Sequence, residues 1–215
     1  MPKSKLTTVA IVSQKGGSGK TTLAVNLATR AAGAKHESCV VDTDPQATAA
    51  VWSDWRGDFL PVVVTAPPAR LGRTIESAKK NGVDFVVIDT PPHADAAARE
   101  AIKAADIVLI PTKPRAFDLA ALEPIADLVN YAKTPAFVVL NAVPASATKL
   151  AHDAREAAKA MGLEICPVDL GERADFHRSS AKGETASELA PDGKAAKEID
   201  KLWKWLSKTL KKGKE

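Results

Sequence analysis

One stretch of the sequence has a clear chemical pattern: Gln14-Lys15-Gly16-Gly17-Ser18-Gly19-Lys20-Thr21-Thr22. A β-branched apolar run precedes it, and an alanine-rich segment of helical length follows it. Glycines here let backbone N–H groups converge on phosphate oxygens, and the start of the helix adds its dipole and free N–H groups. Lys20 would then bridge the β- and γ-phosphates, and the Thr21 hydroxyl would ligate Mg²⁺. The predicted nucleotide-binding residues are Gly16, Gly17, Ser18, Gly19, Lys20, Thr21 and Thr22.

The plainer interpretation of this stretch is a glycine-rich turn with a chance lysine. A strand before the turn, a helix after it and Lys-Thr in register favour a phosphate loop instead. The usual pattern Gly-x-x-x-x-Gly-Lys-[Ser/Thr] is displaced, however, because the expected first glycine is missing and Lys15 stands at the start of the loop.

Short apolar runs alternate with alanine-rich segments along the chain. Strands are predicted at residues 7–13, 39–42, 61–65, 85–89, 107–110, 136–141 and 165–168. Helices are predicted at residues 20–32, 47–56, 69–81, 94–105, 119–132, 149–161 and 194–211. This alternation, with nearly continuous apolar strands, predicts an α/β fold: a mostly parallel, twisted sheet of about seven strands flanked by helices, of the P-loop NTPase type.

Aspartates end two of these strands. Asp42 and Asp44 follow one apolar run, and Asp89 follows another. The carboxyl ends of parallel strands form the edge where open α/β sheets bind ligands. Each aspartate alone is more typical of a loop cap than of a catalyst. Three of them beside a phosphate loop favour catalysis: Asp89 to support Mg²⁺, and Asp42 or Asp44 to polarise the attacking water.

At this point the sequence resembles a known family, the deviant Walker A ATPases, which include the ParA partition proteins and MinD. The resemblance rests on residues 15–22, on Asp42-Thr43-Asp44-Pro45-Gln46 and on Asp89-Thr90-Pro91-Pro92. It extends over nearly the whole chain and is strongest to the small ParA type, similar to ParF. It implies an ATP hydrolase that uses Mg²⁺ and forms a homodimer with ATP.

The resemblance also implies roles for single residues. Lys15 would reach across the dimer to the partner's ATP, so that hydrolysis depends on dimerisation. Asp44 would orient the attacking water, with Asp42 as its neighbour in the switch region. Asn141 would read the edge of adenine, and Asp118 would lie at the dimer face.

Length and composition limit the alternatives. The 215 residues, 45% hydrophobic and 26% charged, suit one soluble domain that spans the chain. The sequence has no apolar run long enough to cross a bilayer and no signal-peptide pattern, so we expect a cytoplasmic protein. Cys39 and Cys166 are expected in strands as buried apolar residues. This spacing gives no support to a metal-carrier or reductase enzyme on the same scaffold.

Positive charge is concentrated at the C-terminal end. Residues 194–215 carry eight lysines against three acidic residues, while the rest of the chain has a net charge of −1. In the predicted helix the apolar residues share one stripe: Ile199, Leu202, Trp203, Leu206 and Leu210.

Three interpretations of this helix remain open. It is a closing helix with a solvated lysine face, a surface that binds DNA phosphates non-specifically, or a membrane-surface helix as in MinD. The resemblance to ParA ranks DNA above membrane. The candidate DNA-binding residues are Arg173, Arg178, Lys182, Lys201, Lys204 and Lys208.

The function expected from the resemblance is DNA partition or intracellular cargo positioning. The ATP-bound dimer would bind nucleoid DNA, and a ParB-like partner or cargo adaptor would stimulate hydrolysis and release. The alternative is a MinD-like positioning ATPase at the membrane.

Overall fold

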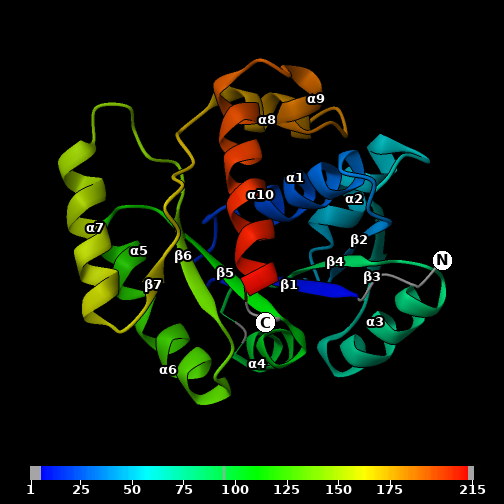
Figure 1. Cartoon of the computed structure of the whole chain (residues 1–215), viewed down its shortest axis with the longest axis horizontal. Coiled ribbons are helices and arrows are strands. Elements are labelled where there is room, and N and C mark those ends of the chain that lie inside the picture. Colours follow the sequence, from blue (N-terminus) through cyan, green and yellow to red (C-terminus); the bar gives the residue numbers. More distant parts are fainter. Residues whose placement is uncertain (1–5, 94, 213–215) are drawn as a thin grey trace.

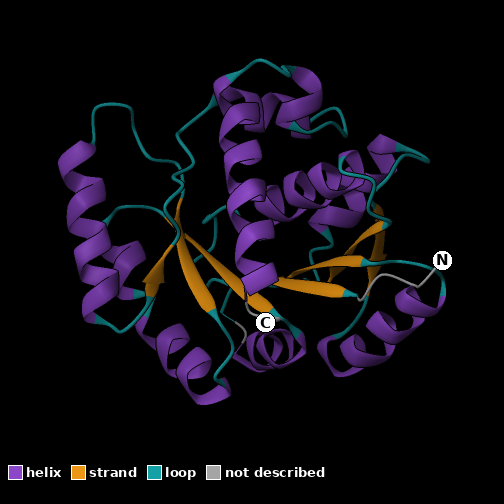
Figure 2. Ribbon diagram, viewed as in Figure 1, coloured by secondary structure: helices purple, strands orange, loops and turns teal. Residues whose placement is uncertain are grey.

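The computed structural model describes residues 6–93 and 95–212. Its strands form one parallel, seven-stranded sheet in the order β3-β2-β4-β1-β5-β6-β7, visibly twisted in Figure 2. The strands are β1 (Thr7–Ile11), β2 (Ser38–Asp42), β3 (Val62–Thr65), β4 (Phe85–Asp89), β5 (Ile107–Thr112), β6 (Ala136–Leu140) and β7 (Glu164–Ile165). The predicted fold class is therefore confirmed.

Helices cover both faces of this sheet (Figure 1). On one face lie α1 (Lys20–Gly33), α2 (Thr48–Arg56), α8 (Ala174–Ser180), α9 (Ala186–Leu189) and α10 (Lys194–Lys212). On the other lie α3 (Leu71–Lys80), α4 (Asp95–Ala104), α6 (Glu123–Ala132) and α7 (Thr148–Ala160). The short α5 (Ala116–Ala120) precedes α6, and the 3₁₀ turn Pro68–Arg70 precedes α3.

Strand residues alternate between the two cores. Val9 and Ile11 face the core under α1 and α10, whereas Ala10 and Val12 face the opposite core. Successive side chains in a strand point to opposite faces, so a strand buried on both sides must be apolar at every position. This requirement explains the continuous apolar runs of the sequence, and it leaves polar side chains to gather at the strand ends.

The structure differs from several expected elements and adds two short helices. The predicted helix at 119–132 is divided into α5 and α6, and α6 begins with Glu123 followed by Pro124, a residue suited to a first helical turn. The strand predicted at 165–168 is β7, only Glu164–Ile165. Helices α8 and α9 were not expected, because neither is long enough to show a clear apolar period.

Strand β5 continues beyond its predicted end, through Pro111 to Thr112. Leu109 is the last β5 residue in register with β1, whereas pairing with β6 continues to Thr112. Proline is tolerated here because the strand has a partner on one side only at this point.

Both cysteines are buried, Cys39 in β2 and Cys166 just after β7 rather than in a strand. Burial raises the pKa of the Cys39 thiol to about 11 and that of Cys166 to about 12. Both therefore stay as unreactive thiols at neutral pH.

The C-terminal helix α10 packs along α1 with its apolar stripe inward. Ile199, Leu202 and Leu206 are fully buried, and the Trp203 ring meets Phe85 edge-on at 5.2 Å. The lysines of α10 are exposed along its whole length. The remaining three residues of the lysine-rich end, 213–215, lie outside the described residues. Within the described residues, no helix is both long and apolar enough to cross a membrane.

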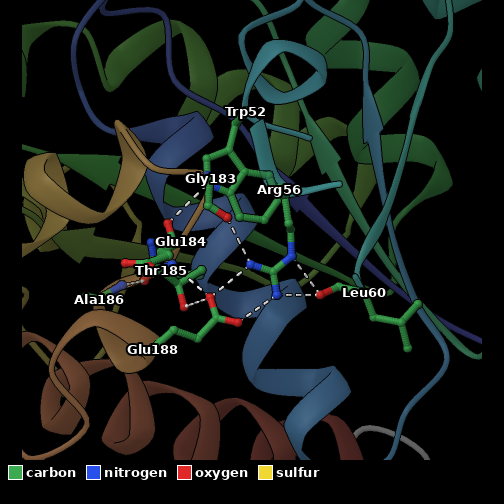
Figure 3. Close-up of polar contacts among 9 residues, drawn as sticks. Trp52, Arg56, Leu60, Gly183, Glu184, Thr185, Ala186 and Glu188 are labelled. Carbon is green, nitrogen blue, oxygen red and sulfur yellow. Dashed lines mark hydrogen bonds and ion pairs between the residues drawn. The ribbon is translucent and has the colours of Figure 1, made fainter. Parts of the chain in front are cut away.

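A largely buried arginine side chain fastens α2 to the segment around the start of α9 (Figure 3). The Arg56 guanidinium donates to the carbonyl oxygens of Gly183 (3.0 Å) and Leu60 (2.6 and 2.9 Å) and to both carboxylate oxygens of Glu188 (2.7 and 2.9 Å). It also lies 4.9 Å from the centre of the Trp52 ring. We call these five residues the Arg56 clamp.

Glycine is required at position 183 of this clamp. Its φ is +67°, and a Cβ there would lie 2.5 Å from the Arg56 backbone nitrogen. The two segments therefore meet backbone to backbone, with the guanidinium filling the space between their carbonyl groups.

Replacing Arg56 by methionine should destabilise the fold by about 2 kcal/mol, because the Gly183 and Leu60 carbonyls and the Glu188 carboxylate lose their donor. The Arg56 side chain is only 7% exposed, so water replaces it poorly. Urea unfolding of both proteins measures the difference.

The control is Lys159→Met, which removes a cation from an ion pair whose partners are 60% and 57% exposed. It should leave the urea midpoint where it is in the wild type. An Arg56→Met protein as stable as this control would show that the clamp adds nothing to stability.

Candidate functional site

The predicted phosphate loop and two of the predicted aspartates meet at the carboxyl ends of three neighbouring strands. In the sheet register Asp42 lies beside Asp89, and Ile11, after which the loop begins, lies beside Asp89 on the other side. Three segments that are far apart in the chain are thereby brought to one edge of the sheet, where α/β folds bind ligands.

The loop has the shape that phosphate binding needs. Gly17 and Gly19 have φ values of +68° and +94°, which favour glycine. A Cβ on Gly19 would also lie 2.2 Å from the amide nitrogen of Asn141. Helix α1 begins at the next residue, Lys20, so its free N–H groups and positive dipole end open at the loop.

Lys20 is buried at the base of this loop, with 7% of its surface exposed. Its ammonium group donates to the carbonyl oxygen of Lys15 at 3.3 Å. Burial lowers the pKa of Lys20, and the nearby carboxylates of Asp89 and Asp44 oppose that shift. A buried ammonium with so few partners is a ready donor for phosphate oxygens.

Asp89 is completely buried beside the first residues of α1. One carboxylate oxygen accepts the Thr21 hydroxyl at 2.6 Å, and the other has no hydrogen-bond partner among the described residues. Burial raises the pKa of Asp89 to about 7, only partly offset by the Thr21 hydrogen bond. The buried Ser18 hydroxyl likewise lacks a partner in the described part of the chain.

These unpartnered oxygens fit a hydrated Mg²⁺ ion. Mg²⁺ prefers oxygen ligands and usually keeps several of its waters, bound through a hydroxyl, a carboxylate and the phosphates of its nucleotide. Thr21 and Asp89 are placed to supply the protein side of that set, and a cation would relieve the cost of a buried carboxylate. Their assignment to Mg²⁺ stays a prediction.

Asp42, the last residue of β2, and Asp44, which follows the strand, differ in burial and in hydrogen bonding. Asp42 is 1% exposed, and its carboxylate accepts the backbone N–H groups of Asp44 (3.0 Å), Ala49 (3.0 Å) and Ala50 (3.3 Å). Burial raises its pKa, opposed by these hydrogen bonds. Asp42 thus fastens the start of α2 to the end of β2.

Asp44 is partly exposed and accepts one hydrogen bond, from the Gln46 backbone at 2.9 Å. Among the described residues, this leaves the Asp44 carboxylate more available to a water molecule than that of Asp42. The geometry thus suits Asp44 better for the catalytic role predicted for both aspartates.

A pocket opens beside the loop, between the start of α1 and the segment 170–177. Its wall includes Gly17, Thr22, Asn141, Arg173 and Phe176. The place suits the base and ribose of a nucleotide whose phosphates lie in the loop. Apart from the loop residues and Asn141, sequence reasoning did not assign these residues to the nucleotide, because the segment 170–177 has no pattern that points to it.

Asn141 holds the loop in this structure. Its amide nitrogen donates to the carbonyl oxygen of Ser18 at 2.7 Å, and its oxygen accepts the N–H group of Ala142 at 2.9 Å. A second N–H and a second oxygen lone pair remain for the contact with adenine, which stays a prediction.

The structure separates the remaining predicted residues into groups. Lys15 is partly exposed on the loop, and Asp118 is buried in α5. Arg173 lies at the pocket beside the loop, where its guanidinium is paired with Glu198 at 2.7 Å. The other candidate DNA-binding residues are exposed on or near α8 and α10: Arg178, Lys182, Lys201, Lys204 and Lys208.

Comparison with protein families agrees with this geometry. Residues 9–186 match the family described as the CobQ/CobB/MinD/ParA nucleotide-binding domain. A protein of Gloeobacter kilaueensis named maintenance of carboxysome distribution protein A is 35% identical over 91% of this chain and 95% of its own length. The chromosome-partitioning ATPase Soj of Thermus thermophilus is 31% identical over 60% of this chain and 62% of its own.

Solved structures show the same fold. The septum site-determining protein MinD of Pyrococcus horikoshii, solved with Mg-ADP, superposes with a TM-score of 0.77. The two chains are 19% identical, and the match covers 97% of this chain and 98% of the other.

The raised pKa of Asp89 predicts how the stability of the ligand-free protein depends on pH. The folded state keeps a proton on Asp89 up to about pH 7, whereas the unfolded chain releases it near pH 4. The free energy of unfolding should therefore fall as the pH rises through this window. Asp89→Asn should remove that loss and be more stable than the wild type at about pH 8, by on the order of 1 kcal/mol.

Urea unfolding of the ligand-free protein at several pH values tests this expectation. Asp153→Asn, on the exposed surface of α7, controls for the loss of one carboxylate. If Asp89→Asn and the wild type had parallel stability curves between about pH 4 and pH 8, the buried carboxylate would not carry the effect.

Proposed function

The chain belongs to the CobQ/CobB/MinD/ParA family of nucleotide-binding proteins, as an ATPase of its ParA/MinD branch, and we propose that it positions cargo by binding nucleoid DNA as an ATP-bound dimer. Hydrolysis then returns it to a form that releases DNA. Release is stimulated by a ParB-like partner or cargo adaptor.

The DNA part of this proposal rests on one observation, the way α10 packs. Its apolar stripe is used up against the core, while its lysines stand in solvent. Lys201 and Lys208 have no ion pair among the described residues, and neither do Arg178 and Lys182 near the other end of the helix. Lys201 and Lys208 are seven residues apart on α10 and so share one side of the helix. Exposed cations without an ion pair are what non-specific phosphate contacts require.

The same packing makes α10 a poor membrane anchor. An interfacial helix buries its own apolar face among lipids, and here Ile199, Leu202 and Leu206 have no exposed surface to offer. Trp205 is also partly buried and packs edge-on against Phe137 at 5.0 Å. DNA is therefore favoured over an anionic bilayer as the partner of the lysines.

Within the ATPase site, each side chain has a proposed task. Lys20 and the loop N–H groups hold the phosphates, while Thr21 and Asp89 hold Mg²⁺, which neutralises charge on the β- and γ-phosphates when bound. Asp44 orients the attacking water. Lys15 reaches the ATP of the second subunit, where its charge stabilises the negative charge that develops on the phosphates.

The cargo is inferred from the relatives rather than from the structure. One relative is named for the distribution of carboxysomes and another for chromosome partitioning. We propose a cargo of one of these kinds, a large protein assembly or a DNA molecule, and a protein that remains on the nucleoid in the cytoplasm between rounds of hydrolysis.

Asp44→Ala and Lys15→Gln should separate ATP binding from hydrolysis. Both variants should bind a fluorescent ATP analogue as the wild type does, and both should hydrolyse ATP at least ~100-fold more slowly. Wild-type turnover per subunit should rise with protein concentration, because each site needs the partner's Lys15. Turnover independent of concentration, or a fully active Lys15→Gln protein, would remove the dimer from the mechanism.

DNA binding is tested with duplexes of random sequence and ATP, ADP or no nucleotide over a range of salt concentrations. Binding should require ATP, persist in Asp44→Ala and weaken with salt, each phosphate contact adding about 0.9 to the slope of log K against log salt. Lys201→Ala/Lys208→Ala should reduce that slope. Lys79→Ala/Lys80→Ala, on α3 across the sheet, is the matched control and should not.

Binding to anionic liposomes, measured in parallel, decides whether DNA or a membrane is the partner of α10. Liposome binding with the same nucleotide dependence and no DNA binding would place the protein with the membrane-bound members of the family. Binding to neither would make α10 a closing helix with a solvated lysine face.

A further inference from the structure

Exposed apolar side chains concentrate in one short stretch, from α2 to the start of β3. Of the eight large exposed hydrophobic residues in the described part of the chain, five lie between residues 51 and 62. They are Val51 (41% exposed), Trp55 (58%), Phe59 (74%), Leu60 (37%) and Val62 (51%). We call these five residues the α2 surface. Leu60 and Val62 line one groove. A gathering of exposed apolar side chains usually marks an interaction site.

The α2 surface has a defined shape. Val51 and Trp55 are four residues apart on α2, so they project from the same side of the helix. Phe59 and Leu60 follow in the connection to β3, where Leu60 also lines the groove between β3 and α3.

The Arg56 clamp holds this connection in place. Two guanidinium N–H groups bind the Leu60 carbonyl oxygen, so the backbone that carries Phe59 and Leu60 is tied to the end of α2. The Leu60 side chain points away from the clamp (Figure 3). The apolar side chains are thus presented on a fastened backbone, which reduces the entropy lost when a partner binds.

Within residues 51–62 the charged side chains without an ion pair among the described residues are acidic, whereas two exposed arginines, Arg70 and Arg73, line the groove with Leu60 and Val62. Asp54, next to Trp55, and Asp58, next to Phe59, are both exposed, and neither has an ion pair among the described residues. The one cation within this stretch, Arg56, is already neutralised by Glu188 at 2.7 Å.

We propose that the α2 surface is the docking site for a protein partner that offers apolar side chains flanked by lysine or arginine. The apolar residues would cover Trp55 and Phe59, and the cations would pair with Asp54 and Asp58. This partner is distinct from DNA, whose phosphates the two carboxylates repel, and from an anionic bilayer for the same reason.

A second copy of the chain fits less well. In a twofold contact the same patch faces itself, so the Asp54 and Asp58 carboxylates of both copies would be brought into one interface. Like charges at such a contact oppose association.

The α2 surface lies on a helix that is bonded to the nucleotide site. The first turn of α2 donates its Ala49 and Ala50 N–H groups to Asp42 at the end of β2. A partner on the last turn of α2 would therefore contact the same helix whose first turn is bonded to Asp42, although docking itself requires neither ATP nor DNA.

A defined peptide tests the proposal. The probe is a helical peptide of about 14 residues with leucines at every third or fourth position and lysines elsewhere. Its control has the same leucines with glutamate in place of lysine. Titrated into ¹⁵N-labelled protein without nucleotide, the lysine peptide should shift amide signals mainly within residues 48–62, and the glutamate peptide should bind at least tenfold more weakly.

Two pairs of variants assign the contacts. Asp54→Lys/Asp58→Lys and Trp55→Ala should each weaken binding of the lysine peptide at least tenfold. Asp127→Lys/Asp153→Lys and Tyr131→Ala change exposed residues of α6 and α7 and should leave it unchanged. Thermal unfolding confirms that all four variants are folded.

Several results would overturn the proposal. These are signals that shift mainly outside residues 48–62, equal binding of the two peptides, and unchanged affinity in Asp54→Lys/Asp58→Lys. Binding of phosphatidylglycerol vesicles to the α2 surface would reject a protein partner, and concentration-dependent shifts there without peptide would assign the surface to a second copy. None of these measurements involves ATP or DNA, so the outcome is independent of the proposed function.

Discussion

The hydrogen bond from the Thr21 hydroxyl to the Asp89 carboxylate joins the start of α1 to the end of β4. Asp89 has no access to water, and a carboxylate in that position is costly unless donors or cations surround it. Lys20 and Thr21 supply part of that surrounding, and one Asp89 oxygen is left without a partner among the described residues. At the predicted phosphate site, the cationic Lys20 and the acidic Asp89 are thus buried close to each other.

From this site, polar contacts continue into the helices on the same face of the sheet. Asp42 binds the first turn of α2, Trp52 in α2 donates to the Glu184 carbonyl oxygen at 3.1 Å, and the Arg56 clamp follows at the end of the helix. From α1, the Asn26 side chain accepts the Ala186 N–H group at 3.1 Å. Both helices that begin at the nucleotide site are therefore fastened to the segment that follows Lys182, one of the candidate DNA-binding residues.

The central strands and the phosphate loop could be predicted because the residues that they require are neighbours in the sequence. A strand buried on both faces needs an apolar residue at every position, so β1, β2 and β4 were visible in the sequence. The phosphate loop was visible because glycine is needed where φ is positive and where Asn141 packs against Gly19. The break between α5 and α6 and the short α8 and α9 were missed, since four to seven residues show too little of a helical period.

The sequence by itself determined the class of fold, the phosphate loop and the family resemblance, because strand periodicity and loop chemistry are written in neighbouring residues. Only the tertiary structure decided which aspartate is fastened by backbone amides and which remains open to water. It likewise placed Arg173 at the pocket beside the loop, paired with Glu198, and tied the Leu60 backbone to Arg56 and so to Gly183 and Glu188. Such distinctions depend on hydrogen bonds and ion pairs between residues far apart in the chain, whose partners no local pattern identifies.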